Sequence, residues 1–458
     1  MVEIKKVKNI VIGSGPAGRL ASFELGKLGE ETVVIEKKHI AGTCLNEGCM
    51  VVCALTDISR FIRNFKRFSE IGFINGEINL DYKKACENVK NTQKFLRKLN
   101  QEENESVNNE VIYGEASVSV EDDKIFIKVD LDKENELQRE NIRKSDEETL
   151  TFEAENLLVA TGARPFIPDI KGKEHVLVSS DILDIEELPK QLNIVGGGII
   201  ATELSNIFSS FGVDVKIIAR SKILKELDVE IKDYVVKKLI EEVEILEDTD
   251  VIEIKENSIV TDKGEFEGKT LIATGRIPNS EILDGIVELN EDGSVKVNEF
   301  FQSSNPHIYA AGDLTGGVCL TPVARKEGIS AARNMAGYLN KVEDVVIPQS
   351  LTLDLDVSFT KRPDNDIDTE NIEDVIIPGL GGPHAFWRIL NGGTGITKVS
   401  LNAETEKVEK VSSISPSSVD DTAYLAFLMN MGIDKEAFDD FLEVHPSTDA
   451  YYKILKIM

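Results

Sequence analysis

Two cysteines separated by four residues stand early in the chain, and their spacing suits redox chemistry. Cys44 and Cys49 bound the segment Cys-Leu-Asn-Glu-Gly-Cys. A disulfide requires Cα atoms about 4.4–6.8 Å apart, and a regular helix separates residues i and i+5 by more than that. Cys44 is therefore expected before a helix or in a distorted first turn. The pair predicts an enzyme that alternates between dithiol and disulfide. Two buried cysteines or half of a metal site are the alternatives, although the sequence holds no second pair with metal-ligand spacing.

A helix is expected to follow the cysteine pair. From Leu55 onward, apolar residues recur at helical spacing, at Ile58, Phe61, Ile62, Phe65 and Phe68. This pattern places Cys49 near the N-terminus of the helix. There the helix dipole stabilises a thiolate, which is the reactive form of cysteine.

A glycine-rich turn between a strand and a helix precedes the cysteines. A short apolar strand leads into Gly13-Ser-Gly15-Pro-Ala-Gly18, and after the helix a second strand, 32–36, ends at Glu36. Gly13 makes the turn, Gly15 lets the backbone approach a pyrophosphate, and Gly18 permits close packing of helix and strand. Glu36 can accept hydrogen bonds from ribose hydroxyls. The segment predicts a dinucleotide site.

The same pattern returns near the middle of the chain. Gly196, Gly198 and Ala201 follow an apolar strand, and a helix and the strand 213–219 come next. That strand ends without an acid, at Arg220, with a serine and lysines close by. These groups suit a 2′-phosphate, so the second site is expected to prefer NADP over NAD. The alternative is that Arg220 is a solvated charge at the end of a strand.

Composition excludes several classes of function. Lys and Arg number 52 and Asp and Glu 81 among 458 residues, a formal net charge of −29. Such a chain is not expected to bind nucleic acid or an anionic membrane surface. No apolar run approaches the roughly 18 residues of a membrane helix, and the N-terminus does not resemble a secretory signal. With only five cysteines, a cytoplasmic protein is expected.

Further segments match a known family in order along the chain. They are Ala160-Thr161-Gly162-Ala-Arg-Pro, Ala273-Thr-Gly-Arg276-Ile-Pro, Ala311-Gly312-Asp313 and Leu320-Thr-Pro-Val-Ala. With the first glycine turn and the cysteine pair, they make the chain resemble the pyridine nucleotide:disulfide oxidoreductases. This family of flavoproteins includes glutathione reductase, dihydrolipoamide dehydrogenase and mercuric reductase. The resemblance extends over essentially the whole chain.

The resemblance implies cofactors and the residues that bind them. FAD is expected in the first dinucleotide fold, and NAD(P)H, with NADPH favoured, in the second. An aspartate placed like Asp313 binds the flavin chain in this family, and Arg276 is expected near the nicotinamide nucleotide. The remaining cofactor contacts implied by the matching motifs are Thr43, Thr161, Gly162 and Gly312.

The resemblance also implies the architecture, an α/β fold with two Rossmann-like dinucleotide-binding domains and a C-terminal α+β dimerisation domain. The expected FAD-binding domain covers 1–165 and resumes over 279–345. The expected NAD(P)-binding domain covers 166–278, and the dimerisation domain covers 346–458.

A homodimer is expected because family members borrow a His-Pro from the partner's C-terminal domain. His445 fits that position and would exchange protons with the attacking and leaving thiols. In the implied mechanism, NADPH reduces the flavin and the flavin reduces the Cys44–Cys49 disulfide. Cys44 then attacks a disulfide substrate, and Cys49 resolves the mixed disulfide. A low-molecular-weight disulfide, a lipoyl group and a small protein disulfide remain open as substrates.

The first departure from the family pattern lies one helical turn beyond Cys49. The family usually has a lysine where this chain has Cys53, and that lysine pairs with a glutamate equivalent to Glu203. Without the cation, the pKa of Glu203 should rise if the side chain is buried. Cys53 is either a third redox thiol or, as we favour, a small buried residue that fills space.

Two further departures lie near the expected cofactor and base. The tyrosine that usually gates the nicotinamide pocket is Ile199, and the glutamate that usually orients the histidine is Ala450, with only Asp449 nearby. The sequence predicts an FAD-dependent NAD(P)H:disulfide oxidoreductase. One alternative is a flavoprotein with a non-nicotinamide electron donor, and another is a flavin-binding interaction protein whose redox chemistry has decayed.

Overall fold

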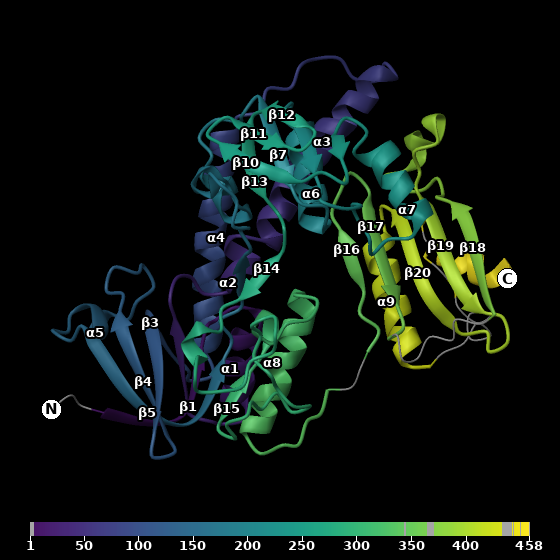
Figure 1. The fold of residues 1–458 in the computed structure, drawn as a ribbon. Coiled ribbons are helices and arrows are strands. Elements are labelled where there is room, and N and C mark those ends of the chain that lie inside the picture. The colour runs from purple at the N-terminus through teal and green to yellow at the C-terminus, as the bar shows by residue number, and fades with distance from the viewer. Residues whose placement is uncertain are drawn as a thin grey trace.

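The computed structural model describes residues 4–342, 345–363, 371–432, 442, 444–448 and 450–457. These residues form a mixed α/β structure with three main sheets, which Figure 1 shows at the lower left, at the top and at the right. The expected fold class is confirmed. No helix among the described residues combines the length and apolar character needed to cross a membrane.

The first sheet has six strands in the order β1-β2-β3-β4-β5-β15, and β1 also pairs with β5. The strands are β1 (Ile4–Ile12), β2 (Thr32–Glu36), β3 (Glu110–Glu121), β4 (Lys124–Leu131), β5 (Thr149–Val159) and β15 (Ile308–Ala310). Strands β1 and β15 run parallel to β5, and β2 runs parallel to β1. Strands β3, β4 and β5 form an antiparallel meander.

Six α-helices lie in the same stretches of the chain as these strands. They are α1 (Pro16–Lys27), α2 (Gly42–Asn46), α3 (Cys49–Glu70), α4 (Tyr82–Glu105), α5 (Glu140–Arg143) and α8 (Thr321–Met335). Helices α1 and α8 lie side by side (Figure 1) and approach closely at Gly328, where an added Cβ would lie 2.2 Å from the carbonyl oxygen of Ala17. Any larger residue at Gly328 would therefore push the two helices apart.

The second sheet has four parallel strands in the order β13-β7-β8-β9. They are β13 (Lys269–Ile272), β7 (Gln191–Val195), β8 (Asp214–Ile218) and β9 (Glu244–Leu246), with helices α6 (Ile199–Ser210) and α7 (Val229–Tyr234). Beside them lies an antiparallel meander of β10 (Val251–Lys255), β11 (Ser258–Thr261) and β12 (Gly264–Glu267). A two-stranded ribbon of β6 (Ala163–Pro165) and β14 (Arg276–Pro278) connects the first two sheets.

The third sheet has five antiparallel strands in the order β16-β17-β20-β19-β18. They are β16 (Gln349–Leu351), β17 (Asp356–Lys361), β20 (Val408–Ser415), β19 (Ile396–Asn402) and β18 (Ile372–Pro378), followed by α9 (Ser418–Asn430) and α10 (Tyr451–Ile457). Tyr451 and Ile454 of α10 pack with Val399 and Val411 of the sheet in one buried cluster. The described part of residues 346–458 therefore has the α+β character expected for the C-terminal domain.

Short 3₁₀ helices and one π-helix complete the described elements. They are η1 (Lys173–His175), η2 (Ser179–Asp184), η3 (Val235–Leu239, the π-helix), η4 (Glu281–Leu283), η5 (Gly312–Thr315) and η6 (Phe386–Asn391).

Helix α3 is joined to the segment between β16 and β17 by charged side chains. Arg60 donates to the Leu353 carbonyl at 2.7 Å and to the Asp356 carboxylate at 2.6 Å. Arg67 and Arg388 both contact Asp354 at 2.9 Å. The Asp354 and Arg388 side chains are only 9% and 8% exposed, so this ion triad is largely shielded from water.

Helix α7 of the second sheet is joined to the third sheet by a second network. Lys398 of β19 lies 2.9 Å from Asp374 and 3.8 Å from Asp228, the residue preceding α7. Tyr234, the last residue of α7, accepts a hydrogen bond at 2.9 Å from the backbone N–H of Gly395. The Lys398 side chain is 9% exposed, so its charge depends on these carboxylates for compensation.

We expect Asp354→Asn to lower the free energy of unfolding by about 3 kcal/mol, because it leaves two poorly solvated guanidinium groups without a counter-charge. Urea unfolding of the purified protein, followed by circular dichroism, measures this change. As a control, Asp184→Asn breaks an exposed pair with Lys90 and should cost less than about 1 kcal/mol. Equal effects of the two substitutions would show that the triad contributes no more than a surface pair.

Candidate active site

The two cysteines lie where two helices meet. Cys44 is in the short helix α2, and Cys49 is the first residue of α3. Gln93 of α4 donates hydrogen bonds to the carbonyls of Leu45 and Asn46 at 3.0 and 3.1 Å, which holds the end of α2 in place. The expectations that Cys44 precedes the helix and that Cys49 lies at its N-terminus are confirmed.

The thiols interact with each other and with helix α8. A hydrogen bond from the Cys49 thiol lowers the pKa of Cys44 to about 6, although burial opposes this change. The Thr321 hydroxyl and the positive charge of Arg325, both on α8, lower it further. The same thiol–thiol hydrogen bond, together with burial, raises the pKa of Cys49. Cys44 is therefore the thiolate of the pair at neutral pH.

Thr321 is a site residue that the sequence did not single out. It is the first residue of α8, and its Oγ1 lies 3.9 Å from Cys49 Sγ. Thr321 belongs to the family motif Leu320-Thr-Pro, which could have drawn attention to it. The motif alone does not show that its hydroxyl lies beside the cysteines. Arg325 and Arg19 were also missed, because neither belongs to a recognisable motif.

Cys53 lies one turn beyond Cys49 and is exposed, so the expectation of a buried, space-filling residue is wrong for the described structure. Burial of its sulfur on one side, followed by repulsion from Cys49 and Glu203, raises the pKa of Cys53. Cys53 is therefore a thiol close to both groups. Cys86 is buried and Cys319 is exposed.

Glu203 on α6 meets the segment that follows β16. Its Oε1 accepts a hydrogen bond from the backbone N–H of Thr352 at 2.7 Å. Burial raises the pKa of Glu203 to about 8, although this hydrogen bond acts in the opposite direction, and Cys49 and Asp356 raise it further. The rise expected from the missing lysine is confirmed. Glu203 is mostly a neutral acid at pH 7 and can donate a proton.

His445 is exposed and has no hydrogen bond or ion pair with another described residue. In Figure 1 the C-terminal end lies at the outer side of the third sheet, away from α2 and α8. His445 makes no hydrogen bond with the cysteines of its own chain. Ala450 is buried, and Ile199 is the first residue of α6. Asp449 lies outside the described residues.

The first glycine turn forms a cradle at the N-terminus of α1. An added Cβ at Gly13 would lie 2.4 Å from the carbonyl oxygen of Ala160, and one at Gly18 only 1.9 Å from the carbonyl oxygen of Gly13. At Gly15 the nearest atom would be 3.9 Å away, which leaves room for a ligand. Glu36 accepts hydrogen bonds from the N–H and hydroxyl of Ser14 at 2.8 and 2.6 Å.

A second group of residues lies near this cradle. Gly312, at φ 77°, packs against the side chains of Ala17 and Ala324, and its N–H donates to Glu327 at 2.7 Å. Burial raises the pKa of Asp313, opposed by the positive charge of Arg276. The half-buried acid, the open space at Gly15 and the positive end of α1 fit a dinucleotide with a pyrophosphate.

The other residues expected to contact a cofactor are Thr43, Thr161 and Gly162 for FAD, and Arg276 for the nicotinamide nucleotide. Thr161 donates from its hydroxyl to the Asn279 carbonyl at 2.8 Å, and Gly162, at φ 68°, has open space around it. Arg276 hydrogen-bonds to the Ala163 carbonyl. The carbonyl of Thr43 accepts a hydrogen bond from Glu47 within the turn between α2 and α3.

The second glycine turn repeats this geometry at α6. An added Cβ at Gly196 would lie 2.1 Å from the Ala273 carbonyl oxygen, whereas one at Gly198 would meet nothing within 4 Å. Ala201 is fully buried. Arg220 is exposed beyond β8 and is unpaired among the described residues. Lys222, in contrast, is paired with two acids, Glu247 at 3.0 Å and Asp248 at 2.7 Å.

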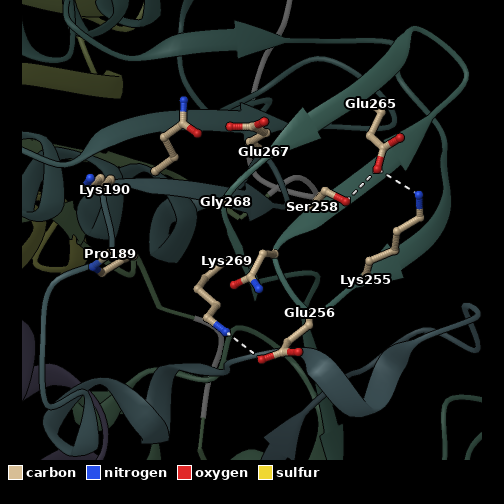
Figure 2. A pocket seen from close by; sticks show the side chains of 11 residues that line it. Pro189, Lys190, Lys255, Glu256, Ser258, Glu265, Glu267, Gly268 and Lys269 are labelled. Atoms are coloured by element: carbon tan, nitrogen blue, oxygen red, sulfur yellow. Dashed lines mark hydrogen bonds and ion pairs between the residues drawn. The ribbon is translucent and has the colours of Figure 1, made fainter.

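An open pocket of about 930 Å³ lies elsewhere on the second sheet (Figure 2). It is lined by Gln191 and Lys269, the first residues of β7 and β13, whereas dinucleotides bind at the opposite, carboxyl ends of parallel strands. Lys255 pairs with Glu265 in its wall. We assign it no role in cofactor binding. Among the described residues, no group of three His, Cys, Asp or Glu side chains is placed to bind a metal.

Two glycine cradles and a dithiol between them define a dinucleotide-binding oxidoreductase, and comparisons with known proteins agree. A model of the pyridine nucleotide-disulphide oxidoreductase family matches residues 7–328. An uncharacterized protein of Methanocaldococcus jannaschii is 30% identical over 98% of both chains. The dihydrolipoyl dehydrogenase of Buchnera aphidicola is 29% identical over 95% of this chain and 92% of that protein.

A solved structure shares the fold. The Cu(II) complex of a mutant of RclA, an HOCl-induced flavoprotein disulfide reductase from Escherichia coli, has a TM-score of 0.84 at 23% identity. The match covers 99% of this chain and 100% of that one. The chain therefore belongs to the pyridine nucleotide-disulphide oxidoreductase family. It is an oxidoreductase, and the family implies an FAD and a pyridine nucleotide.

We expect iodoacetamide to alkylate Cys44 in the reduced protein with a rate that reaches half its maximum near pH 6. Below that pH the thiolate is protonated and the rate falls. Mass spectrometry of peptides after timed quenching measures the rate. Cys49→Ala removes the hydrogen-bond donor and should move the midpoint to higher pH. An unmoved midpoint would show that the thiol pair does not set the reactivity of Cys44.

Glu203 should make stability depend on pH. Because its pKa rises from 4.5 to about 8 on folding, the folded protein binds more protons between these values. Stability therefore falls as pH increases through this window, by at most about 1.4 kcal/mol per unit. Urea unfolding from pH 5.5 to 7.5 should show a smaller fall in Glu203→Gln than in the unchanged protein. The exposed Glu147→Gln is the control. Parallel curves for all three would show that Glu203 is already ionised.

Proposed function

We propose that the protein is an FAD-dependent disulfide reductase that takes electrons from NAD(P)H. The observation that carries this proposal is the Cys44–Cys49 dithiol, with a thiolate at Cys44, next to a glycine cradle that fits a dinucleotide. The relatives named as dihydrolipoyl dehydrogenase and the disulfide reductase RclA support the same chemistry. The substrate is a low-molecular-weight disulfide, a lipoyl group or a small protein disulfide.

The proposed reaction is a thiol–disulfide exchange in two steps. The Cys44 thiolate attacks one sulfur of the substrate, so a mixed disulfide forms and the other sulfur leaves as a thiolate that takes up a proton. The Cys49 thiol loses its proton and attacks Cys44 Sγ, which releases the second substrate thiol. This closes the Cys44–Cys49 disulfide. A bound FAD, reduced by NAD(P)H, would supply the two electrons that reopen it.

His445 is proposed to supply the proton for the leaving thiolate, as a partner-supplied residue in a homodimer. Its exposure and the lack of a hydrogen bond with the cysteines of its own chain favour a role in the partner's site. Imidazole titrates near neutrality and suits proton exchange with thiols.

The cytoplasmic location of the protein also remains a prediction.

NADPH is the favoured electron donor because Arg220 is exposed and free to pair with a 2′-phosphate. Lys222 supports this assignment less, since two acids already compensate its charge. Flavin contacts are proposed for Gly13, Gly15, Gly18 and Glu36.

A non-nicotinamide donor is the second candidate, and two observations favour it. Ile199 stands at the start of α6 where the family places a gating tyrosine, and Cys53 replaces the lysine that would pair with Glu203. Both positions lie on the expected path of hydride to the flavin. A decayed, interaction-only protein is disfavoured because the thiol pair is positioned and activated.

Anaerobic titration of the purified protein with NADPH and then NADH decides between the first two candidates. We expect NADPH to reduce the flavin and to produce the long-wavelength absorbance of a thiolate next to oxidised flavin. Arg220→Gln should weaken the response to NADPH about tenfold and leave NADH unchanged. No reduction by either nucleotide, with the band still formed by dithionite, would favour another donor.

A further inference from the structure

We propose that Arg325 and Arg19 form an anion-binding rim beside Cys44, so that the substrate is a small disulfide with carboxylate groups near its sulfurs. This inference rests on the proposed disulfide reductase function and narrows its substrate class. The two arginines come from adjacent helices, α8 and α1, and both interact electrostatically with Cys44.

The position of Arg325 follows from helix geometry. It lies four residues after Thr321 on α8, so the two side chains share one face of the helix. Thr321 Oγ1 is 3.9 Å from Cys49 Sγ, which places this face at the thiols. Arg325 is exposed and has no hydrogen bond or ion pair with another described residue. Its guanidinium therefore keeps its donors available for a ligand.

Arg19 supplies the second positive charge from α1. It immediately follows Gly18, and α1 is packed tightly against α8 at Gly328. Its side chain is 15% exposed and forms an ion pair with Glu103 of α4. Burial lowers the pKa of Arg19, and among its charged neighbours are Glu103, Arg325 and Cys44. The positive charge of Arg19 is partly compensated by Glu103, so Arg325 is expected to contribute more to anion binding.

The overall charge of the chain makes this local arrangement significant. A protein of net charge −29 repels anions on average, so an anionic substrate needs a local positive potential to approach the thiolate. A guanidinium binds carboxylate through two parallel hydrogen bonds, which also orients the ligand. The rim therefore favours disulfides that carry acids over neutral or cationic ones of the same size.

A simpler role for Arg325 is to stabilise the Cys44 thiolate and nothing else. That role would affect the reaction with every disulfide to the same extent, because it acts on the nucleophile. Recognition of an anion would affect only the acidic substrates. The test must therefore compare substrates of different charge rather than follow one activity.

The experiment uses the holoenzyme reduced with dithionite, with excess reductant removed, so it does not depend on the nicotinamide donor. Dithiodiglycolate, bis(2-hydroxyethyl) disulfide and cystamine are the anionic, neutral and cationic probes. Stopped-flow absorbance measures the rate at which each probe removes the thiolate–flavin band. Each rate is divided by the rate of the same probe with dithiothreitol, which corrects for intrinsic reactivity.

We expect corrected rates at least about tenfold higher for dithiodiglycolate than for cystamine, with a smaller difference at high salt. Arg325→Gln should reduce this preference about tenfold, and Arg325→Lys should restore part of it. Lys326→Gln is the matched control. It removes one exposed positive charge from the adjacent position of α8, which points about 100° away, and should change the preference less than about twofold.

Three results would overturn the inference. Equal corrected rates for all probes in the unchanged enzyme would exclude an anion-selective site while leaving the disulfide reductase intact. An equal slowing of all probes in Arg325→Gln would assign Arg325 to the thiolate alone. If no probe oxidises the reduced enzyme, the proposed function itself fails, and the substrate class falls with it.

Discussion

The position of the thiol pair depends on how helix α3 is fixed. Its first residue is Cys49, and its later turns are bound through Arg60 and Arg67 to the segment between β16 and β17. The same segment provides the Thr352 N–H to Glu203. These ion pairs therefore tie the helix that carries Cys49 to the same segment that contacts Glu203 and leads into the C-terminal sheet. Movement of that segment would reach the chemistry directly, because α3 transmits it as a rigid element.

Two neighbouring parts of the site have opposite effects on negative charge. Around Cys44, a thiol donor and an unpaired guanidinium stabilise negative charge. Around Glu203, burial and nearby acids disfavour negative charge, and no cation among the described residues takes the place of the lysine usual in the family. Cys53 lies between these environments and shares the second. The result is a thiolate on the α8 side of the pair and uncharged groups on the α6 side.

The sequence predicts the helices, strands and turns well. It does not predict which side chains from distant parts of the chain come into contact. Glycine turns, strand ends and the start of α3 follow from spacing, because backbone conformation there depends on neighbouring residues. The approach of Arg325 to Cys44 joins residues nearly three hundred positions apart, and no motif records it. Cys53 was expected to be buried because free cysteine packs well, but its side of α3 is exposed. The rise in the pKa of Glu203 was foreseen because it required only a missing partner.

The network that joins α7 to the third sheet has a mechanical consequence. The narrow ribbon of β6 and β14 crosses between the first and second sheets at the position of a hinge, while α3 and α6 also pack together in one buried cluster. A swing about that hinge would pull Lys398 away from Asp228 and Tyr234 away from Gly395. Opening the chain in this way would remove Asp228 from Lys398 and leave Asp374, in the same sheet, as the nearest counter-charge of this shielded ammonium. These contacts oppose rotation of the second sheet about the ribbon, so we expect a nucleotide to reach the start of α6 with little movement between the sheets.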